Sequence, residues 1–275
     1  TKVEALLPGS PGDPPTEVEK QLREEIGSVD ILLGGPPCQG HSDLNNHTRR
    51  SDPKNELLMK MARCAEILEP EHILIENVTG VLHDRGDVFT RACKQLEELH
   101  YSVDWAVLRG EDLGVPQTRH RVFVVASKVQ RPNLELVSEE FEVSTRSTDW
   151  AIRDLLVTPP DGRFDESTNS AAVTRRRIDH LFDHGRYELP DKERPRCHRL
   201  KSHSYKSVYG RIRPHRPAPT ITTGFTSMGQ GRFVHPYERR MITPHEAARL
   251  QFFPDYFDFG ELGTASSGIT INGVV

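Results

Sequence analysis

Residues 29–42 read VDILLGGPPCQGHS, and the prediction of the fold starts from this stretch. A short apolar run ends in two glycines and two prolines, so it has the length and the boundaries of a β-strand. We interpret it as a buried strand of an α/β sheet, with Cys38 just past its carboxyl end, where such sheets place ligand crevices. The prolines fix φ in the turn and hold the thiol in place. Cys38 is therefore a candidate nucleophile, although a cysteine in this position is more often a small buried side chain without a chemical role.

The composition is that of an ordinary globular protein. The chain has 275 residues, of which 35% are hydrophobic and 28% charged, and it has no apolar run near the roughly 20 residues that a membrane span needs. Its first residues show no basic region followed by an apolar core, so we expect no signal peptide and a cytoplasmic location. The four cysteines show no paired short spacing, which argues against a disulfide framework and a zinc ribbon.

Charge is distributed unevenly along the chain. The formal net charge is −4, yet residues 171–240 hold 16 Lys and Arg against 6 Asp and Glu. A basic segment in an otherwise acidic chain is the usual electrostatic mark of a surface that faces nucleic acid. The alternative is a solvated, loop-rich face without such a partner.

Strands and helices alternate over the first half of the chain. Apolar runs of strand length lie at residues 72–78, 101–108 and 122–126. Residues 17–26, 56–68 and 87–99 have the composition and residue periodicity of charged or amphipathic helices. This alternation predicts an α/β sheet of the doubly wound, Rossmann-like type. Residues 41–55 are too polar to pack, and we interpret them as a mobile lid over the crevice.

Charged side chains lie at the ends of two of these strands. Glu76 interrupts an apolar run near its carboxyl end, where burial without a partner would cost several kcal/mol or keep the group protonated. It is a candidate proton donor, unless it simply points into water. Arg119 and Arg121 alternate at period two before the run at 122–126, so both are expected to face one side. Their planar guanidinium groups suit phosphate or a base edge.

The pattern changes beyond residue 130. A short helix is predicted at 148–156, whereas residues 159–240 show no long periodic element and predict a second, irregular domain. Within it, residues 219–223 favour a strand, and the glycine-rich residues 224–231 favour a loop that lets backbone approach a ligand. Cys197 with two nearby histidines gives an incomplete ligand set, so we predict no metal site.

Residues 243–246, TPHE, have the pattern of a helix N-terminus. Thr243 suits the N-cap, Pro244 the first helical position, and Glu246 can return to the cap. Pro254 then ends the predicted helix.

Four motifs in order resemble those of the DNA (cytosine-5) methyltransferases of the bacterial restriction-modification type. They are GPPCQ at 35–39, ENV at 76–78, QTRHR at 117–121 and RMITPHEAARLQFFP at 240–254. The match spans nearly all of the chain from residue 29 onward. The resemblance implies transfer of a methyl group from S-adenosylmethionine to carbon 5 of a cytosine that is flipped out of double-stranded DNA.

The same resemblance implies a division into domains. Residues 1–130 would form part of a catalytic α/β domain with a partial Rossmann-like methyltransferase sheet, completed by residues 241–275. Residues 131–240 match the place of the family's smaller target-recognition domain. The predicted lid would close over the flipped base.

Roles of single residues follow from the resemblance too. Cys38 would add to carbon 6 of the ring, Glu76 would bond or protonate ring nitrogen 3, and Arg119 and Arg121 would hold the base and its phosphates. Cofactor contacts are implied for Pro36, Leu57, Asn272 and Val274. Predicted DNA contacts are Gln39, Ser42, Arg49, Arg50, Gln117, Arg211, Arg213, Thr220, Thr222 and Arg232. The sequence leaves open whether these arginines read guanine edges or hold phosphates.

The sequence departs from the family pattern before Cys38. The family's Phe-x-Gly-x-Gly turn and the acidic residue for the cofactor ribose are missing, residues 1–28 are too few to supply the missing strands, and no helix follows the last motif at 272–274. Three interpretations stay open: one polypeptide of a split enzyme whose partner carries the cofactor motif, a fragment of a longer enzyme, or a catalytically silent DNA-binding relative. A relative that acts on transfer RNA is a further alternative. The intact nucleophile, acid and arginine pair favours the first two.

Overall fold

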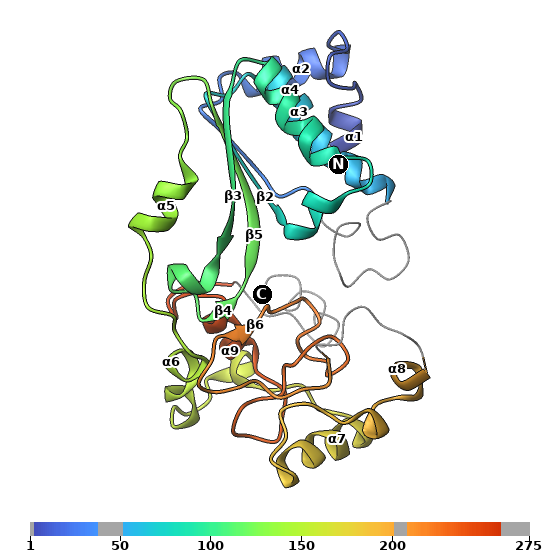
Figure 1. The fold of residues 1–275 in the computed structure, drawn as a ribbon, viewed down its shortest axis with the longest axis vertical. Coiled ribbons are helices and arrows are strands. Elements are labelled where there is room, and N and C mark those ends of the chain that lie inside the picture. The colour runs from blue at the N-terminus through green and yellow to red at the C-terminus, as the bar shows by residue number, and fades with distance from the viewer. Residues whose placement is uncertain (1–2, 38–51, 201–207, 260–275) are drawn as a thin grey trace. The chain divides into compact units, whose positions relative to one another are not determined.

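The structure is a computed structural model that describes residues 3–37, 52–200 and 208–259 (Figure 1). The chain forms two compact units. Unit 1 comprises Thr1–Leu108 and His120–Phe141, and unit 2 comprises Arg109–Arg119 and Glu142–Val275. Among the described residues, no helix combines the length and the apolar character that crossing a membrane requires.

Unit 1 is built on a four-stranded mixed sheet with the order β1-β2-β5-β3. Its strands are β1 (Ile31–Gly34), β2 (His72–Val78), β3 (Ser102–Arg109) and β5 (His120–Ser127). Strands β1 and β2 are parallel, whereas β2 and β5 are antiparallel. The strands form near their predicted positions, and the fold is confirmed as a mixed α/β architecture rather than as a parallel, doubly wound sheet.

The helices of unit 1 follow the predicted stripes. They are α1 (Val3–Leu6), α2 (Glu17–Ile26), α3 (Leu57–Leu68), α4 (Val88–Glu98) and α5 (Leu134–Glu140). Helices α3 and α4 lie side by side (Figure 1) and pack apolar residues on one face of the sheet. The shared core contains Ala62, Ala65, Phe89 and Leu96 from the helices and Ile73, Ile75, Val122 and Val124 from the strands. The alternation of buried and half-buried residues along β2 follows from this one-sided packing.

Strand β1 is an edge strand, and the prediction that it is buried is wrong. Ile31 and Leu33 are 57% and 68% exposed. They lie on the face opposite to Leu32, which packs against the core beneath α3 and α4. An apolar run marks a strand by its composition, but burial also requires neighbours on both sides. Among the described residues, β1 is paired with β2 alone.

A buried ion pair ties the N-terminal residues to α3. Arg63 and Glu19 have fully buried side chains, and Nη2 of Arg63 lies 2.6 Å from Oε2 of Glu19. Arg63 also donates to the carbonyl oxygen of Asp13 and pairs with Glu66 at 2.9 Å. Since a buried charge requires partners, this network fixes the loop before α2 against α3.

The Arg63–Glu19 pair makes the free energy of unfolding depend on pH in the acid range. Hydrogen bonds from Arg63 lower the pKa of Glu19 to about 2. A carboxyl group whose pKa is lowered on folding stabilises the folded state above its unfolded pKa, and that contribution is lost as pH falls through the folded pKa. We expect this group to lower the free energy of unfolding by about 3 kcal/mol between about pH 5 and pH 2. Denaturant titrations followed by circular dichroism measure it, and an unchanged pH dependence in Glu19→Gln would contradict the assignment.

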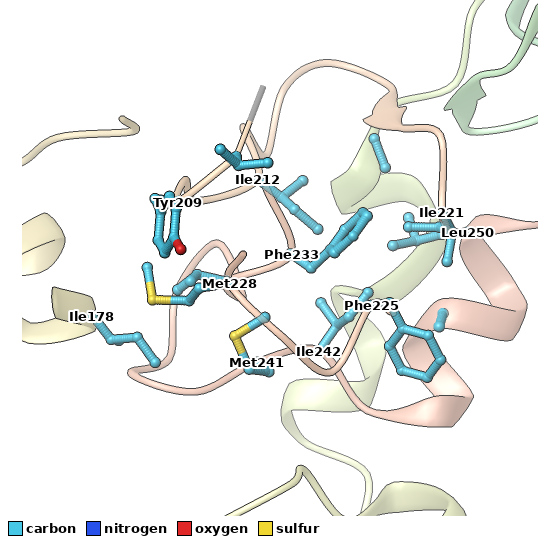
Figure 2. Close-up of a cluster of buried hydrophobic side chains, with 14 of the residues drawn as sticks. Ile178, Tyr209, Ile212, Ile221, Phe225, Met228, Phe233, Met241, Ile242 and Leu250 are labelled. Atoms are coloured by element: carbon cyan, nitrogen blue, oxygen red, sulfur yellow. The ribbon is translucent and has the colours of Figure 1, made fainter. Parts of the chain in front are cut away.

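Unit 2 has a large apolar core and little strand structure. Its helices are α6 (Thr148–Ile152), α7 (Ala172–Asp183), α8 (Arg196–Leu200) and α9 (Pro244–Leu250). Two short strands, β4 (Gln117–Thr118) and β6 (Ala218–Pro219), pair in parallel. Figure 2 shows the core, to which Phe225, Phe233, Met241 and Leu250 belong. Thr243 and Glu246 form the predicted capping box at the start of α9.

Two predictions for the second half need correction. Helix α7 has 12 residues and lies where no long periodic element was expected, because Ile178 and Leu181 are its only buried residues and give a weak stripe. The strand predicted at 219–223 is reduced to β6. The glycine-rich loop packs on its own unit: a Cβ on Gly231 would lie 2.2 Å from the ring of Phe233. That glycine allows close packing, and the approach of this loop to a ligand stays a prediction.

The compact units differ from the predicted domains. Residues 241–259, predicted to complete the catalytic domain, contribute Met241, Ile242 and Leu250 to the core of unit 2. Residues 131–141, predicted as target recognition, belong to unit 1. The units divide the chain by packing, whereas the predicted boundaries divide it by function, so the functional division stays a prediction.

Candidate active site

Glu76 and Arg121 form an ion pair in the sheet of unit 1. Nε of Arg121 lies 2.9 Å from Oε1 of Glu76. The register explains the contact, because Glu76 lies opposite Phe123 and Val78 lies opposite Arg121. The two charged residues are therefore diagonal neighbours on one face of an antiparallel pair. Their side chains are 36% and 17% exposed, so water screens the pair only in part.

The loop that leads to Cys38 leaves β1 beside this pair. Strands β1 and β2 run in parallel with Gly34 opposite Ile75, so their carboxyl ends lie together. The buried Asn77 donates from Nδ2 to the carbonyl oxygen of Pro36 at 3.4 Å. This bond holds the start of the loop against the end of β2. Cys38 lies outside the described residues, as do Gln39, Ser42, Arg49 and Arg50.

The end of the predicted lid is fixed in place. Pro53–Glu56 forms a 3-10 helix capped by Asp52. Asn55 is buried and donates to Oδ2 of Asp84 at 2.6 Å. The prediction that residues 41–55 are too polar to pack is therefore wrong for Asn55, whereas Pro53 and Lys54 are exposed. A polar side chain packs when it finds a hydrogen-bond partner. Residues 41–51 lie outside the described part of the chain.

The Glu76–Arg121 pair is suited to proton transfer or hydrogen bonding with a bound ring. Arg121 donates to one oxygen of the Glu76 carboxyl group, which restrains the orientation of that group. A heterocyclic ring bound against the Glu76 carboxyl group would exchange a proton with it at the ring atom that faces its oxygen. A nucleophile carried by the loop after β1 would act at the same end of the sheet.

Two other thiols are poor nucleophiles. Burial raises the pKa of Cys64. Burial also raises the pKa of Cys93 to about 12, and the nearby charge of Glu97 acts in the same direction. Because the thiolate is the reactive form, both side chains stay protonated thiols at neutral pH.

The motif at 117–121 is divided between the two units. Arg121 lies on β5 in unit 1, whereas Arg119 precedes that strand and belongs to unit 2. Arg119 lies between β4 and β5, so the two arginines do not share one strand, and the role of Arg119 stays a prediction. Gln117 is fully buried, and its Nε2 donates to the carbonyl oxygen of Leu250 at 3.1 Å. This side chain links β4 to the end of α9 and has no exposed surface with which to contact DNA.

Two predicted DNA contacts of unit 2, Thr220 and Arg232, have side-chain partners within the unit. Oγ1 of Thr220 donates to the carbonyl oxygen of Thr118 at 2.6 Å. The hydroxyl of Thr222 is buried and makes no hydrogen bond among the described residues. Arg232 pairs with Glu188 at 2.9 Å. These contacts leave the DNA roles of the three residues as predictions.

The other two predicted arginines stack on aromatic rings. The guanidinium carbon of Arg211 lies 4.4 Å from the ring centroids of both Phe182 and Tyr187. Arg213 is exposed, and its guanidinium carbon lies 4.6 Å from the centroid of Tyr187. Neither ring contact was predictable from spacing, because the rings and the arginines come from separate segments.

One cluster in unit 2 has the residue types of a metal site: His235, Glu238 and Glu246. Nδ1 of His235 accepts hydrogen bonds from the backbone N–H groups of Tyr237 and Glu238 at 3.1 and 2.9 Å. The neutral ring therefore carries its proton on Nε2, which faces Glu246 at 3.4 Å and has no lone pair to offer a metal ion. Burial lowers the pKa of His235, which favours this neutral form.

Arg240 supplies the positive charge at that cluster. Its Nη2 lies 2.6 Å from Oε1 of Glu246, which also caps α9. The cluster therefore holds the segment before α9 in place. His235 was not predicted as a functional residue, because its signal in the sequence is a histidine at the end of a short apolar pair.

Of the four residues predicted to contact a cofactor, two are described. Pro36 lies in the loop after β1, and Leu57 begins α3; both are half-buried. Asn272 and Val274 lie outside the described residues. The cofactor contacts therefore stay predictions.

The chain is similar to known proteins over almost its whole length. Residues 12–275 match the family described as C-5 cytosine-specific DNA methylase. The type II methyltransferase M1.BsuMI of Bacillus subtilis (strain 168) is 49% identical over 260 residues, which cover 94% of this chain and 61% of that protein. The type II methylase M.HgiDII of Herpetosiphon aurantiacus is 34% identical over 85% of this chain and 68% of its own length. The chain thus spans 61% of the first relative.

A solved structure shares the fold. The S. pombe Dnmt2 methyltransferase matches with a TM-score of 0.55 and 18% sequence identity, covering 89% of this chain and 72% of that one. At this identity the likeness concerns the fold alone.

Proposed function

The chain belongs to the C-5 cytosine-specific DNA methylase family, and on that premise we propose that it methylates carbon 5 of cytosine in double-stranded DNA as part of a complete enzyme. The observation that carries the proposal is the Glu76–Arg121 ion pair, which lies where the loop to Cys38 leaves the sheet. An enzyme that methylates bacterial DNA would act at the nucleoid, in the cytoplasm.

Carbon 5 of cytosine is a weak nucleophile because the ring is aromatic. The thiolate of Cys38 adds to carbon 6, and the electron pair displaced from the 5,6 double bond makes carbon 5 nucleophilic. Glu76 bonds or protonates nitrogen 3, which takes up the charge that would otherwise build up in the ring. Arg121 holds the Glu76 carboxyl group in position. After methylation, water takes the proton from carbon 5, the electron pair left there forms the 5,6 double bond and expels the thiolate of Cys38, and nitrogen 3 returns its proton to Glu76, which restores the aromatic ring.

S-adenosylmethionine supplies the methyl group when it is bound. Pro36 and Leu57 precede and follow Cys38 in the sequence, and both have half-buried apolar side chains. Such side chains fit contact with an adenine ring. Asn272 and Val274 are proposed to complete these contacts. The described residues thus fit the cofactor in part.

We propose that a segment outside residues 1–275, on the same polypeptide or on a partner, carries the cofactor motif and extends the sheet beside β1. The support is that β1 pairs with β2 alone in the described part of the chain, and that Ile31 and Leu33, on the face of β1 opposite to Leu32, are 57% and 68% exposed. Apolar edge strands of this kind are normally paired or covered, and parallel strands are normally covered on both faces. Calorimetry tests the proposal: residues 1–275 alone should not bind S-adenosylmethionine. Tight binding by the lone chain would contradict it.

The substrate is tested in cells. The complete enzyme is expressed in a host that lacks cytosine-5 methylation, and its DNA and transfer RNA are both sequenced after bisulfite treatment. We expect methylated cytosine at a defined motif in DNA and none with Cys38→Ser. Methylation confined to transfer RNA would show that the proposed substrate is wrong, and absence of both would favour a DNA-binding relative without activity.

A further inference from the structure

Four cation–π contacts join three arginines to two aromatic rings in unit 2, and this group is called the stack. Arg213 lies over Tyr187, Arg211 lies over both Tyr187 and Phe182, and Arg239 lies over Phe182, with distances of 4.4 to 5.4 Å between guanidinium carbons and ring centroids. Phe182 comes from α7 and Tyr187 from the segment after it. Cation–π contacts of this kind restrain the plane of each guanidinium group.

The three arginines of the stack have different electrostatic surroundings. Arg239 pairs with Asp179 at 3.1 Å and with Asp183 at 2.6 Å, so its charge is compensated on α7. Arg211 is half-buried between two rings, and its Nε is buried without a hydrogen bond in the described part of the chain. Arg213 is exposed, and no ion pair with a carboxylate is found for it among the described residues.

The backbone that carries Arg213 is rigidly held. Ile212 is 1% exposed, and its N–H donates to the carbonyl oxygen of Val234 at 2.9 Å. The carbonyl oxygen of Pro214 accepts from the N–H of Asp149 at 3.0 Å. The Arg213 side chain therefore projects from a hydrogen-bonded backbone and lies over the ring of Tyr187, whose carbonyl oxygen accepts from the N–H of Arg211 at 2.9 Å.

From this placement we propose that Arg213 is a specificity-determining residue that donates two parallel hydrogen bonds to N7 and O6 of one guanine in the major groove. The proposal rests on the proposed function and names the residue that selects the target. Tyr187 is a positioning residue, which acts by holding the plane of the guanidinium group. Arg211 supports the same ring from within the stack.

A stacked guanidinium group is better suited to a base edge than to a phosphate. Reading N7 and O6 requires the donor fork to lie in the plane of the base, and a ring that fixes this plane reduces the conformational entropy lost on binding. A phosphate accepts from many directions, so a fixed plane would bring little advantage there. Lysine could replace arginine at a phosphate but not at a bidentate guanine contact.

The test compares methylated motifs of variants of the complete enzyme in the expression host described above. Wild type defines the motif. In Arg213→Ala we expect the preference for guanine at one position to fall about 10- to 100-fold, while the other positions are retained. Arg213→Lys should relax the same position, and Tyr187→Leu should relax it more weakly. Arg239→Ala, at the far end of the stack, is the matched control and should keep the motif.

Duplexes with 7-deazaguanine confirm the contact, because this base lacks the N7 acceptor and leaves the phosphates intact. At the selected position it should weaken methylation by wild type and leave Arg213→Ala unaffected. An even loss of methylation at all sites, with rescue by Arg213→Lys, would show a phosphate contact and overturn the proposal. An unchanged motif in Arg213→Ala would overturn it as well. Wild-type enzyme without any DNA methylation would instead refute the proposed function.

Discussion

In the Glu76→Gln variant of the complete enzyme, methyl transfer is expected to be at least about 100-fold slower than in the wild type. Glutamine keeps the size of the side chain but cannot give a proton to ring nitrogen 3. It also replaces the carboxylate that pairs with Arg121 at 2.9 Å. Initial rates of methyl incorporation into DNA over a range of DNA concentrations measure the effect, which should appear in kcat rather than in KM, because the acid acts while the thiol attacks.

Glu71 gives a matched control for this change. It is exposed and precedes β2, the strand that carries Glu76. Glu71→Gln removes the same charge from the same part of the unit, so its rate should stay within about twofold of wild type, as expected for a surface substitution away from the reacting groups. A Glu76→Gln enzyme that is as active as Glu71→Gln would show that Glu76 takes no part in the reaction.

Replacing Arg63 by Met is expected to lower the free energy of unfolding by about 3–5 kcal/mol. The substitution leaves the buried carboxylate of Glu19 without the guanidinium group that lies 2.6 Å from it. It also removes the hydrogen bond to the carbonyl oxygen of Asp13. Urea unfolding followed by circular dichroism measures the loss.

Two further variants separate the effect of burying a charge on the free energy of unfolding from the effect of losing its ion-pair partner. Arg23 and Glu69 form an ion pair at 2.9 Å, but their side chains are 51% and 52% exposed, so Arg23→Met should cost less than about 1 kcal/mol. The double variant Arg63→Met/Glu19→Met removes both fully buried charges of the pair and should recover part of the loss. A cost of Arg63→Met no greater than that of Arg23→Met would contradict the account of the buried network.

Features encoded by local sequence were predicted well. Apolar runs gave the strands of unit 1, and Thr243 with Glu246 gave the start of α9, because strand composition and capping depend on residues close in the chain. Glu76 and Arg121 were predicted from their strand positions. Their contact depends on the antiparallel register of β2 and β5, which no local pattern encodes.

Features that depend on tertiary neighbours were missed or wrong. The exposure of β1 depends on what lies beside it, and the burial of Gln117 depends on α9, which is distant in the chain. Helix α7 has a weak apolar stripe because polar and charged residues cover most of its surface. The stack of Arg213, Tyr187, Arg211 and Phe182 brings together separate segments, so the sequence alone could not separate the arginines by role.

The central claim is that Cys38 attacks carbon 6 of a flipped cytosine, and covalent trapping tests it most directly. Fluorine at carbon 5 cannot leave as a proton does, so DNA with 5-fluorocytosine in the target motif should hold the enzyme at the methylated adduct. With S-adenosylmethionine and the cofactor-binding part supplied, we predict a complex that survives denaturation, with the DNA attached to Sγ of Cys38 by mass spectrometry. No adduct with the wild type, or an undiminished adduct in Cys38→Ser, would contradict the claim.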